Sequence, residues 1–579
     1  MGRLQILFFT GLLLFSSCSE NKTEKTQEAF ECKIRLNRDP GRINPIFSPT
    51  SIGREVFQYI FLPLADFHPE SLELIPILIE DIPTAKEIVK TDGDTLVAYD
   101  IKIRKDALWS DGERITNRDY EFIVKAIKHP NSKAIGWKPY FDFIKDVQPD
   151  SLDDKKLTVL MDKNYMLSKE TAITICLMPN HVLDPEGSLS NISIERLNQK
   201  DFVDTDSSRI KVIENVNNTM NAKTNVVQTG PYVLKDYQTD LYIVLERQEN
   251  YWGLKHENIP YLNAEPQKLI FSIVPDEVTA VSMAKESKLD ILSMRQSQNF
   301  LELKNDDNVN SEWQFHVPQL MMFFYIAMNN KSSLLADKTL RKAMAHLADV
   351  DDYIENIDGG LGTRTTGYFH PTKSYYNDKL KQIPYDLQKA ASLLDEAGWK
   401  DLDQDGIREK QISGKRQNLE FDFLITGSQL SRNLALLFQE SAKKVGVKIN
   451  IVIKKNALMQ KENLSNFNYD MAALANSLDA APDDPYSRWH SDNAVAGKRN
   501  QIGYINAESD KLIEKIRTTR DEEKRKEYYI ELQELMYEDQ PAVFLYSPLQ
   551  KIMISKRLKA TTTSKRPGYM ANTFTLADS

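Results

Sequence analysis

The sequence predicts a mixed α/β fold, because segments with the two-residue period of strands alternate with segments with the 3.6-residue period of helices. Residues 96–104 alternate apolar and polar side chains, as a half-buried strand does. Residues 447–453 repeat that alternation directly after a helical stripe that ends at Gly446. The chain has 579 residues, far more than one domain of roughly 150 residues, so we expect several domains.

The N-terminus is predicted to be a signal peptide, residues 1–17. Arg3 precedes an apolar run over residues 4–15, and small residues follow that run. The run is shorter than the roughly 18–20 residues that a membrane-spanning helix needs. Cys18 follows two serines, which resembles a bacterial lipobox, and this resemblance implies that the thiol carries a lipid. Residues 18–29 are polar and aperiodic, which predicts a flexible tether.

Regular elements follow in order along the rest of the chain. Thr116 and Asp119 form a capping-box pattern that opens an amphipathic helix. A later helix begins with Asp386 as its cap and stops at Gly398. Apolar stripes predict helices over residues 340–347, 387–394, 430–445 and 521–537. The last of these has a dense Lys/Glu outer face, which is typical of a solvated helix surface.

The composition excludes several function classes. Lys and Arg total 74 against 83 Asp and Glu, a net charge of −9, which argues against a nucleic-acid partner. Cys18, Cys32 and Cys176 are too few for a disulfide scaffold and are not spaced as a zinc site. The sequence leaves open whether Cys32 and Cys176 form one bridge after export. There is no HExxH or GxSxG motif, so we predict no catalytic residues, no metal site, no cofactor and no enzymatic activity.

Two polar loops contain residue types that are found in ligand-binding loops. Residues 359–367 are rich in glycine and hydroxyls but lack the GK[ST] of a nucleotide-binding loop. Residues 401–406 resemble the start of a calcium loop, but the twelfth position is Ile412 rather than a glutamate. A polar turn is the better interpretation of this second loop.

A series of short motifs, in one order, resembles the extracellular solute-binding proteins of family 5, the dipeptide- and oligopeptide-binding receptors of ABC importers. The opening motif is similar to the family's DPxxLNP, and a later helix ends in its AGW. The helix start at 116–119 fits the same order. Together with the opening at residues 39–45 and the AGW helix at 390–399, the matching blocks are residues 103–112, 177–183, 229–232 and 246–252.

The resemblance implies an α/β, two-lobed fold like that of type II periplasmic binding proteins, with an extra third domain. Lobe one is expected to combine residues 30–60, 196–272 and 476–579. The extra domain is expected at residues 61–195 and lobe two at residues 273–475. The chain would then cross the hinge near residues 273–275 and near Ala473.

The resemblance also implies a function. The protein is expected to be an exported, lipid-anchored binding protein that captures peptides in the cleft between its lobes and passes them to an ABC permease. It is expected to act as a monomer, anchored through Cys18 in the cell envelope, as a periplasmic or surface lipoprotein. Hinge closure over the ligand would be the mechanism.

Four residues are expected to bind the ligand. The family's amine-binding aspartate follows a strand and precedes an Asp-Pro element, which here matches Asp479. Asn476 stands where the family usually has tryptophan. Arg364, in the glycine-rich loop, is expected to pair with a ligand carboxylate, and Trp489 lies close to the cleft segment. Asp479 as a simple turn-capping residue is the alternative.

Three other functions stay open at this point. The same fold could bind a non-peptide cargo such as nickel, haem or a sugar, which the departure at Asn476 favours. A signalling receptor without a permease is a second alternative. A secreted hydrolase is a third, and it would need a nucleophile–base pair or a metal set that the sequence does not offer.

Overall fold

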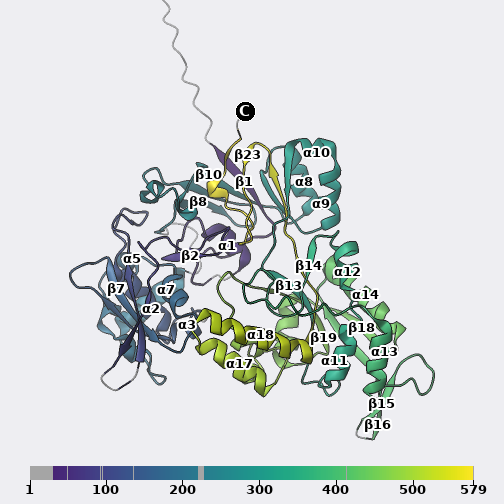
Figure 1. Ribbon diagram of the computed structural model, residues 1–579. Helices are drawn as coiled ribbons and strands as arrows, with labels where there is room; N and C mark the ends of the chain where they lie inside the picture. The colour runs from purple at the N-terminus through teal and green to yellow at the C-terminus, as the bar shows by residue number, and fades with distance from the viewer. Residues whose placement is uncertain are drawn as a thin grey trace, which may run out of the picture.

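The computed structural model describes residues 30–47, 50–90, 93, 95–134, 136–219, 227–412 and 414–577. The predicted signal peptide, the tether and Cys18 fall outside these residues. Within them, the strands form sheets of seven, five and four strands and four two-stranded ribbons. The three large sheets lie in separate parts of the molecule, which we call lobe one, lobe two and the extra domain (Figure 1). None of the described helices is both long enough and apolar enough to span a membrane.

Lobe one is built on the seven-stranded sheet, in the order β12-β22-β11-β1-β10-β9-β8. Its strands are β1 (Glu31–Leu36), β8 (Tyr232–Gln238), β9 (Tyr242–Arg247), β10 (Lys268–Ile273), β11 (Ile291–Met294), β12 (Trp313–His316) and β22 (Lys551–Ser555). β1 pairs in parallel with β10 and with β11. Its alternate side chains Cys32, Ile34 and Leu36 are buried in the core. Helices α8 (Glu277–Lys285), α9 (Ser297–Asn305) and α10 (Asp307–Glu312) lie together at the edge of this lobe (Figure 1).

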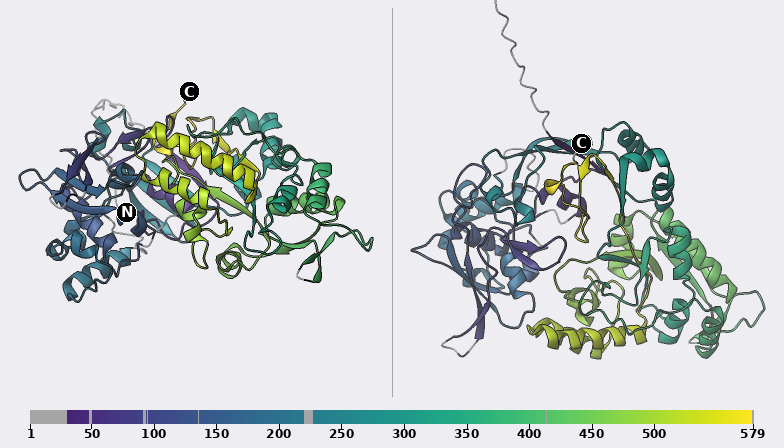
Figure 2. Two further views of the ribbon diagram at one scale, coloured as in Figure 1. Left: turned by 60° about the horizontal axis from the view of Figure 1, so that its bottom comes forward. Right: turned by 45° about the horizontal axis from the view of Figure 1, so that its top comes forward.

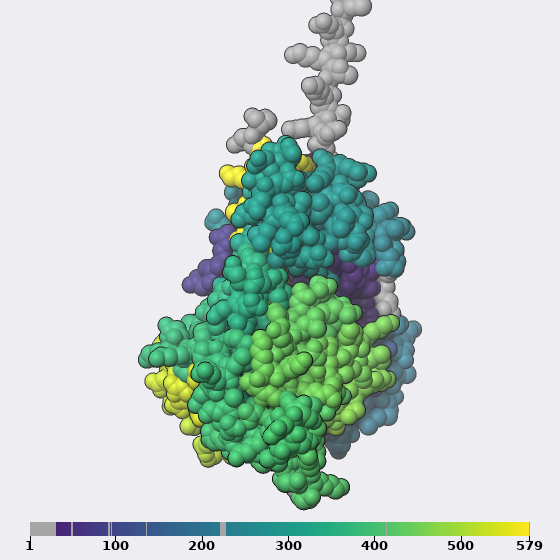
Figure 3. Space-filling view, turned by 90° about the vertical axis from the view of Figure 1, so that its right-hand side faces the viewer, coloured from purple at the N-terminus to yellow at the C-terminus, as the bar shows by residue number. Residues whose placement is uncertain are grey.

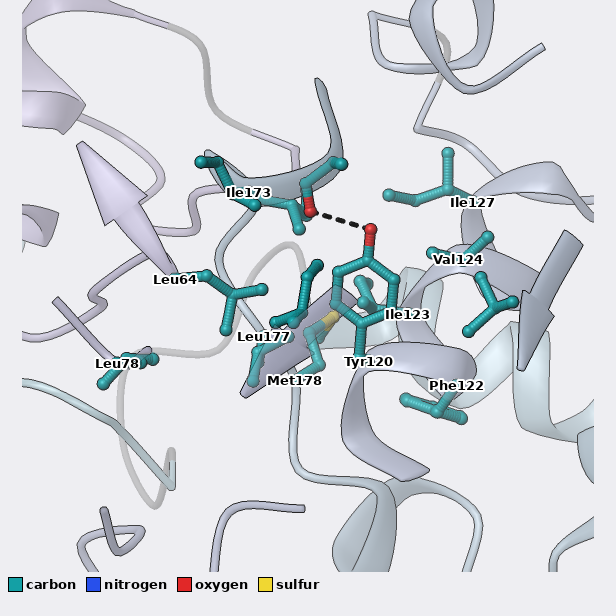
Figure 4. Close-up of a cluster of buried hydrophobic side chains, with 14 of the residues drawn as sticks. Leu64, Leu78, Tyr120, Phe122, Ile123, Val124, Ile127, Ile173, Leu177 and Met178 are labelled. Carbon is teal, nitrogen blue, oxygen red and sulfur yellow. Dashed lines mark hydrogen bonds between the residues drawn. The ribbon is translucent and has the colours of Figure 1, made fainter. Parts of the chain in front are cut away.

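The extra domain contains the four-stranded sheet β4-β5-β7-β6. Its strands are β4 (Ala85–Val89), β5 (Thr95–Lys102), β6 (Ile144–Pro149) and β7 (Lys156–Asp162), and its helices include α2 (Asn117–Lys128), α3 (Lys138–Phe141), α4 (Ser168–Ile173) and α7 (Ser207–Asn218). The predicted capping box is present at Thr116 and Asp119. The buried Tyr120 of α2 donates a hydrogen bond of 2.8 Å to the carbonyl oxygen of Ala172, inside a cluster of apolar side chains (Figure 4). This bond satisfies the only polar atom that the tyrosine side chain brings into the core.

Lobe two is built on the five-stranded sheet β18-β17-β19-β13-β20. Its strands are β13 (Met322–Met328), β17 (Glu420–Ile425), β18 (Lys448–Ile453), β19 (Met471–Ser477) and β20 (Ala542–Phe544). Helices α11 (Lys338–Ala345), α13 (Leu387–Glu396) and α14 (Gln429–Lys444) join the core on one face. Helices α17 (Ala507–Thr518) and α18 (Glu522–Asp539) join the core on the other face and run side by side (Figures 1 and 2). The alternation along β19 explains this, since Met471 contributes to the first core and Ala472 to the second.

The predicted helix boundaries in lobe two agree with the structure. Asp386 caps α13 by accepting a hydrogen bond from the backbone N–H of Lys389. Gly398 and Gly446 follow the ends of α13 and α14 with φ angles of +81°, a conformation that favours glycine. α18 follows its cap Asp521 and ends at Asp539, close to the predicted range 521–537.

The sheets divide the chain differently from the expected domain boundaries. β11 and β12 lie within the expected lobe two, but β11 pairs with β1 and both strands pair with β22, in lobe one. β20, α17 and α18 lie within the expected C-terminal part of lobe one, but they belong to lobe two. α7 joins the core of the extra domain, beyond its expected end at residue 195. Strand periodicity marks which residues form a strand, whereas the partner strand is chosen by tertiary packing.

The crossings between the lobes also need correction. Residues 317–321 connect β12 to β13, and residues 545–550 connect β20 to β22, so the chain passes between the two sheets there. The backbone N–H of Gln550 donates to the carbonyl of Pro318 at 2.9 Å, so the two connections run side by side. The expected crossings near residues 273–275 and Ala473 fall instead within lobe one and within lobe two.

A buried ion pair lies next to these connections. The ammonium of Lys551, on β22, is 2.7 Å from the carboxylate of Asp358, and their side chains are 6% and 5% exposed. The same ammonium donates to the hydroxyl of Ser297 at 2.9 Å. Asp358 precedes β14 (Gly362–Arg364), which pairs with β21 (Tyr546–Pro548) beside the second crossing. The pair therefore ties lobe one to the segment that leads into lobe two.

The two cysteines of the folded part are both free and buried. Cys32 is in β1, and Cys176 donates weakly to the carbonyl of Phe61 at 3.9 Å. Burial raises the pKa of the Cys176 thiol to about 12. The structure answers the question that the sequence leaves open, because the two thiols are not bridged.

Replacing Asp358 with alanine should destabilise the protein strongly, because Lys551 would keep a buried charge without its partner. The expected loss is about 3–5 kcal/mol of unfolding free energy, seen as a lower midpoint in a urea titration followed by circular dichroism. Glu508→Gln is the control, since its pair with Lys511 is exposed at the surface and should contribute less than about 1 kcal/mol. Equal midpoints for the two variants would contradict a structural role for the buried pair.

Candidate ligand-binding site

The carboxyl ends of β17, β18 and β19 form one edge of the lobe two sheet, because these strands are parallel in the pairs β17–β18 and β17–β19. Ligands commonly bind in the crevice outside such an edge. A cavity of about 380 Å³ lies there. Its polar lining comes from the loops that leave the strands and from the start of α14, and includes Thr426, Ser428, Ser431, Asn456 and Gln460.

A lysine side chain binds the backbone of the loop that follows β19. The ammonium of Lys373 donates hydrogen bonds to the carbonyl oxygens of Asp479, Ala480 and Ala481, at 2.5, 3.1 and 2.6 Å. Burial lowers the pKa of Lys373. Further along the loop, the hydroxyl of Tyr375 donates to the carboxylate of Asp483 at 2.8 Å. Three carbonyls that converge on one ammonium fix the backbone of this loop and so the position of the Asp479 side chain.

Asp479 reaches across to lobe one. Its carboxylate is 3.0 Å from the guanidinium of Arg54, which lies on α1 (Ser51–Phe57), and the two side chains are 72% and 43% exposed. The pair is solvated, so it contributes at most about 1 kcal/mol. It joins two solvent-accessible charges from opposite lobes.

The lobe one side of the cleft carries further charges near Arg54. Lys565 pairs with Asp66 at 2.6 Å, and the next residue, Arg566, donates to the sulfur of Met322 at the start of β13. Burial raises the pKa of Glu55, the neighbour of Arg54, to about 7, although Arg566 and two other arginines act in the opposite direction. In a space-filling view, N-terminal residues are visible between the region of α8–α10 and the green segments of lobe two (Figure 3).

Asn476 and Trp489 come together at one small cavity beside the larger one. Both are 3% exposed. Asn476 is the sixth residue of β19 and points to the same face as Leu474, while Trp489 ends the short helix α16 (Tyr486–Trp489). The small cavity shares Tyr325 and Leu474 with the cavity at the strand ends. The structure thus groups two of the four expected ligand residues.

Arg364 lies in a different environment. It ends β14, and its guanidinium is 2.7 Å from the carboxylate of Asp351 and 2.6 Å from the carbonyl oxygen of Ile383. It lines a separate cavity, near Val350 and Gln540, and neither of the two cavities above includes it. The expected pairing of Arg364 with a ligand carboxylate therefore stays a prediction, without a neighbouring ligand residue to support it.

The acidic loop of lobe two is an exposed turn. The carboxylates of Asp401, Asp403 and Asp405 lie within 4.8 Å of one another and are exposed. Arg416, on the neighbouring strand β16 (Lys415–Asn418), forms ion pairs with Asp403 and with the buried Glu409. The guanidinium of Arg416 therefore neutralises part of the negative charge of this loop, which agrees with its interpretation as a polar turn.

Four charged residues near the cleft are not indicated by the sequence: Arg54, Glu55, Lys373 and Lys565. They come from three segments far apart in the chain, and none belongs to a short motif. The sequence near Arg54 and Glu55 indicates only a helix start: Thr50 is the N-cap of α1 and accepts a hydrogen bond from the N–H of Gly53. Only the fold brings these charges to the same cleft.

Replacing Glu55 with glutamine should flatten the dependence of stability on pH. The raised pKa means that the folded protein keeps a proton that the unfolded chain releases, so stability falls as pH rises from about 4.5 to about 7. The variant should therefore be more stable than the wild type at pH 8, by about 1 kcal/mol or more, in urea titrations between pH 4 and pH 8. Glu531→Gln, on the exposed face of α18, is the control. An unchanged pH profile for Glu55→Gln would contradict the assignment.

Solved structures of other proteins share this architecture. In a solved structure, the oligopeptide-binding protein AppA of Bacillus subtilis, in complex with a nonapeptide, has a TM-score of 0.70 at 22% identity, covering 95% of this chain and 99% of that one. NikZ from Campylobacter jejuni, in complex with Ni(L-His), has a TM-score of 0.69 at 24% identity, covering 94% and 97%. These likenesses show the two-lobed α/β fold.

The sequence comparisons agree. The AppA sequence is 24% identical to this chain over 575 residues, which cover 96% of this chain and 94% of that protein. The family model described as bacterial extracellular solute-binding proteins, family 5 Middle, matches residues 74–498. That match spans most of the chain and all of lobe two up to the loop that follows Trp489. The protein therefore belongs to the bacterial extracellular solute-binding proteins of family 5.

Proposed function

We propose that the protein is an exported, lipid-anchored receptor that captures peptides between its lobes and delivers them to an ABC permease. The supporting observation is the pair of Asp479 and Arg54, which sets an accessible carboxylate of lobe two against a cation of lobe one. AppA, similar over almost the whole chain, is an oligopeptide-binding protein. The family consists of solute-binding proteins, and the proposed role needs binding and release rather than catalysis.

The proposed anchor for a peptide is its N-terminal ammonium. A carboxylate favours an ammonium strongly where water is partly excluded, and among the described residues only Arg54 pairs with the Asp479 carboxylate. The ligand ammonium would replace the guanidinium of Arg54 at Asp479, while Lys373 holds the loop backbone. The extended backbone of the peptide would then form strand-like hydrogen bonds with the segment that follows β19. The arrangement accepts many side chains, because the main contacts are made with groups that every peptide has.

Closure of the cleft would follow from contacts to both lobes. A ligand shifts the equilibrium toward the closed form only by the difference in its affinity for the open and the closed form. The two side-by-side connections, residues 317–321 and 545–550, offer few residues whose φ and ψ angles must change in a hinge rotation. The ends of a peptide bound near Asp479 would contact α1 of lobe one and the strand ends of lobe two together.

The identity of the cargo is open to a direct test. Native mass spectrometry of the purified protein, followed by denaturation and analysis of the released mass, should detect a mixture of short peptides. NikZ in its solved complex holds nickel with histidine, so a released metal complex would replace the peptide in this proposal. The lipid anchor is tested in the same instrument, because lipidation of Cys18 adds the mass of acyl chains to a chain that begins at that residue.

Replacing Asp479 with asparagine should weaken the binding of a free tripeptide, such as trialanine, at least tenfold in calorimetry. The amide keeps the size of the side chain but removes the charge that attracts the ammonium. N-acetylation of the peptide should weaken binding to the wild type by a similar factor and should have little further effect on the variant. This non-additivity separates an amine anchor from a general change in the cleft.

The matched control is Asp395→Asn, which removes a carboxylate from another surface pair with an arginine, at the end of α13. It should bind trialanine as the wild type does. Thermal unfolding of all variants checks that the fold is kept. Unchanged affinity of the Asp479 variant would contradict the anchor, with the peptide function itself still supported by binding to the wild type.

A further inference from the structure

A buried amide in the small cavity lacks any partner. Both the Nδ2 and the Oδ1 atoms of Asn476 are buried and form no hydrogen bond within the described part of the chain. A buried amide that leaves both a donor and an acceptor unsatisfied is costly. The neighbouring positions of β19 on the same face, Ala472 and Leu474, are apolar, so packing alone does not require a polar residue at position 476.

Other unsatisfied donors converge on the same space. The indole Nε1–H of Trp489 is buried and has no acceptor among the residues that the structure describes. Arg488 and Arg499 also line the cavity, and no described carboxylate forms an ion pair with either of them. Gln501 and the aromatic rings of Tyr325 and Tyr368 complete the lining. The lining of the cavity therefore includes two arginines, a buried indole N–H and two amide residues, and no acidic side chain.

The carboxylates closest in sequence are already engaged. Asp479 pairs with Arg54 at 3.0 Å, and Asp484 pairs with Arg517 at 3.1 Å. Asp483 accepts a hydrogen bond from Tyr375, and Asp492 accepts one from Tyr486 at 3.1 Å. Within the described residues, the charges of Arg488 and Arg499 are therefore left to water or to a ligand. Unpaired arginines around buried donors are the usual surroundings of a bound carboxylate or phosphate.

The cavity is small and lies at the cleft. Its volume is about 20 Å³, room for about one water-sized group, so its side chains must move apart to admit a carboxylate. It adjoins the cavity of about 380 Å³ at the strand ends through Tyr325 and Leu474. Arg499 is exposed, so the lining of the cavity extends to the protein surface.

We propose that this cavity binds a carboxylate of the cargo, so that the receptor prefers anionic ligands. The two guanidinium groups and the indole N–H would donate to the carboxylate oxygens. The amide of Asn476 would donate through Nδ2 and accept through Oδ1 from an N–H next to the carboxylate, which is the pattern of a peptide unit. This inference rests on the proposed peptide function and adds the charge of the ligand to it.

The carboxylate can belong to an acidic side chain or to the C-terminus of a short peptide, and the test separates these sources. Calorimetry compares four tripeptides, with a central glutamate or glutamine and with a free or amidated C-terminus. If the side chain is bound, the glutamate peptides should bind at least tenfold more tightly than the glutamine peptides. If the C-terminus is bound, the free acids should bind at least tenfold more tightly than the amides.

The double variant Arg488→Gln/Arg499→Gln should lose this preference while still binding the uncharged, amidated glutamine peptide. Arg196→Gln, at an exposed position of helix α6 (Ile194–Leu197) in the extra domain, is the matched control and should keep the preference. Asp479→Asn should weaken all four peptides by a common factor and keep the preference too. Equal affinities of the wild type for acidic and neutral peptides would overturn the proposal.

Asn476→Leu distinguishes a ligand-binding amide from a structural one. Leucine has a similar size and removes the unsatisfied polar atoms, so the ligand-free variant should melt at a higher temperature than the wild type. The same variant should lose at least tenfold in affinity for the preferred acidic peptide. A higher melting temperature with unchanged affinity, or a lower melting temperature, would contradict the role given to Asn476.

A parallel thermal-shift series covers the case in which no peptide binds to the wild type, which would refute the proposed function. It uses succinate and N-acetylglutamate as carboxylates, with succinamide and N-acetylglutamine as neutral counterparts. Stabilisation by the carboxylates alone, absent in the double arginine variant, would support an anion site in a receptor for another cargo. No stabilisation by either carboxylate would overturn the anion site as well.

Discussion

The rest of the structure depends on how the chain passes between its two large sheets. Residues 317–321 and 545–550 run side by side, and the buried pair of Lys551 and Asp358 lies next to them. A buried charge is tolerated only with a close partner, so this pair fixes β22 against the segment that leads into β14. Every contact across the cleft, including that between Arg54 and Asp479, depends on the relative position that these connections allow.

Solvation separates the structural charges from those that can serve a ligand. Lys551 and Asp358 are almost fully buried and have each other, whereas Arg54 and Asp479 are both partly exposed. Water weakens the exposed pair, and a ligand ammonium can therefore compete with Arg54 at little cost. Lys373 adds the necessary rigidity, because it binds the carbonyls of the loop and leaves the Asp479 carboxylate free to exchange.

The small cavity around Asn476 differs in polarity from the two apolar cores of lobe two. Those cores are filled by apolar and aromatic side chains, while the cavity keeps several polar groups without partners. Such groups reduce the stability of the ligand-free protein and gain their hydrogen bonds only when a complementary group enters. The exchange of stability for binding is common at functional sites. Together with Asp479, the cavity would recognise a positive and a negative charge of the ligand.

The sequence by itself determined the class of fold and most of the elements of lobe two. Asp386, Gly398 and Gly446 mark helix ends because caps and positive φ angles are local requirements. The sequence motifs also identified the family and the loop that carries Asp479. Asn476 and Trp489 were expected at the ligand site, and the structure brings these two together.

Only the tertiary structure decided which strands pair and which charges meet. β11 and β20 are short, mostly buried strands, and their partners β22 and β13 both lie hundreds of residues away in the sequence, so packing rather than local preference selects them. For the same reason Arg54, Glu55 and Lys373 carried no signal as site residues, and Arg364 was assigned to the cleft although it pairs with Asp351. The role of a charged side chain depends on the residues around it, and in the folded protein these residues come from segments that are far apart in the sequence.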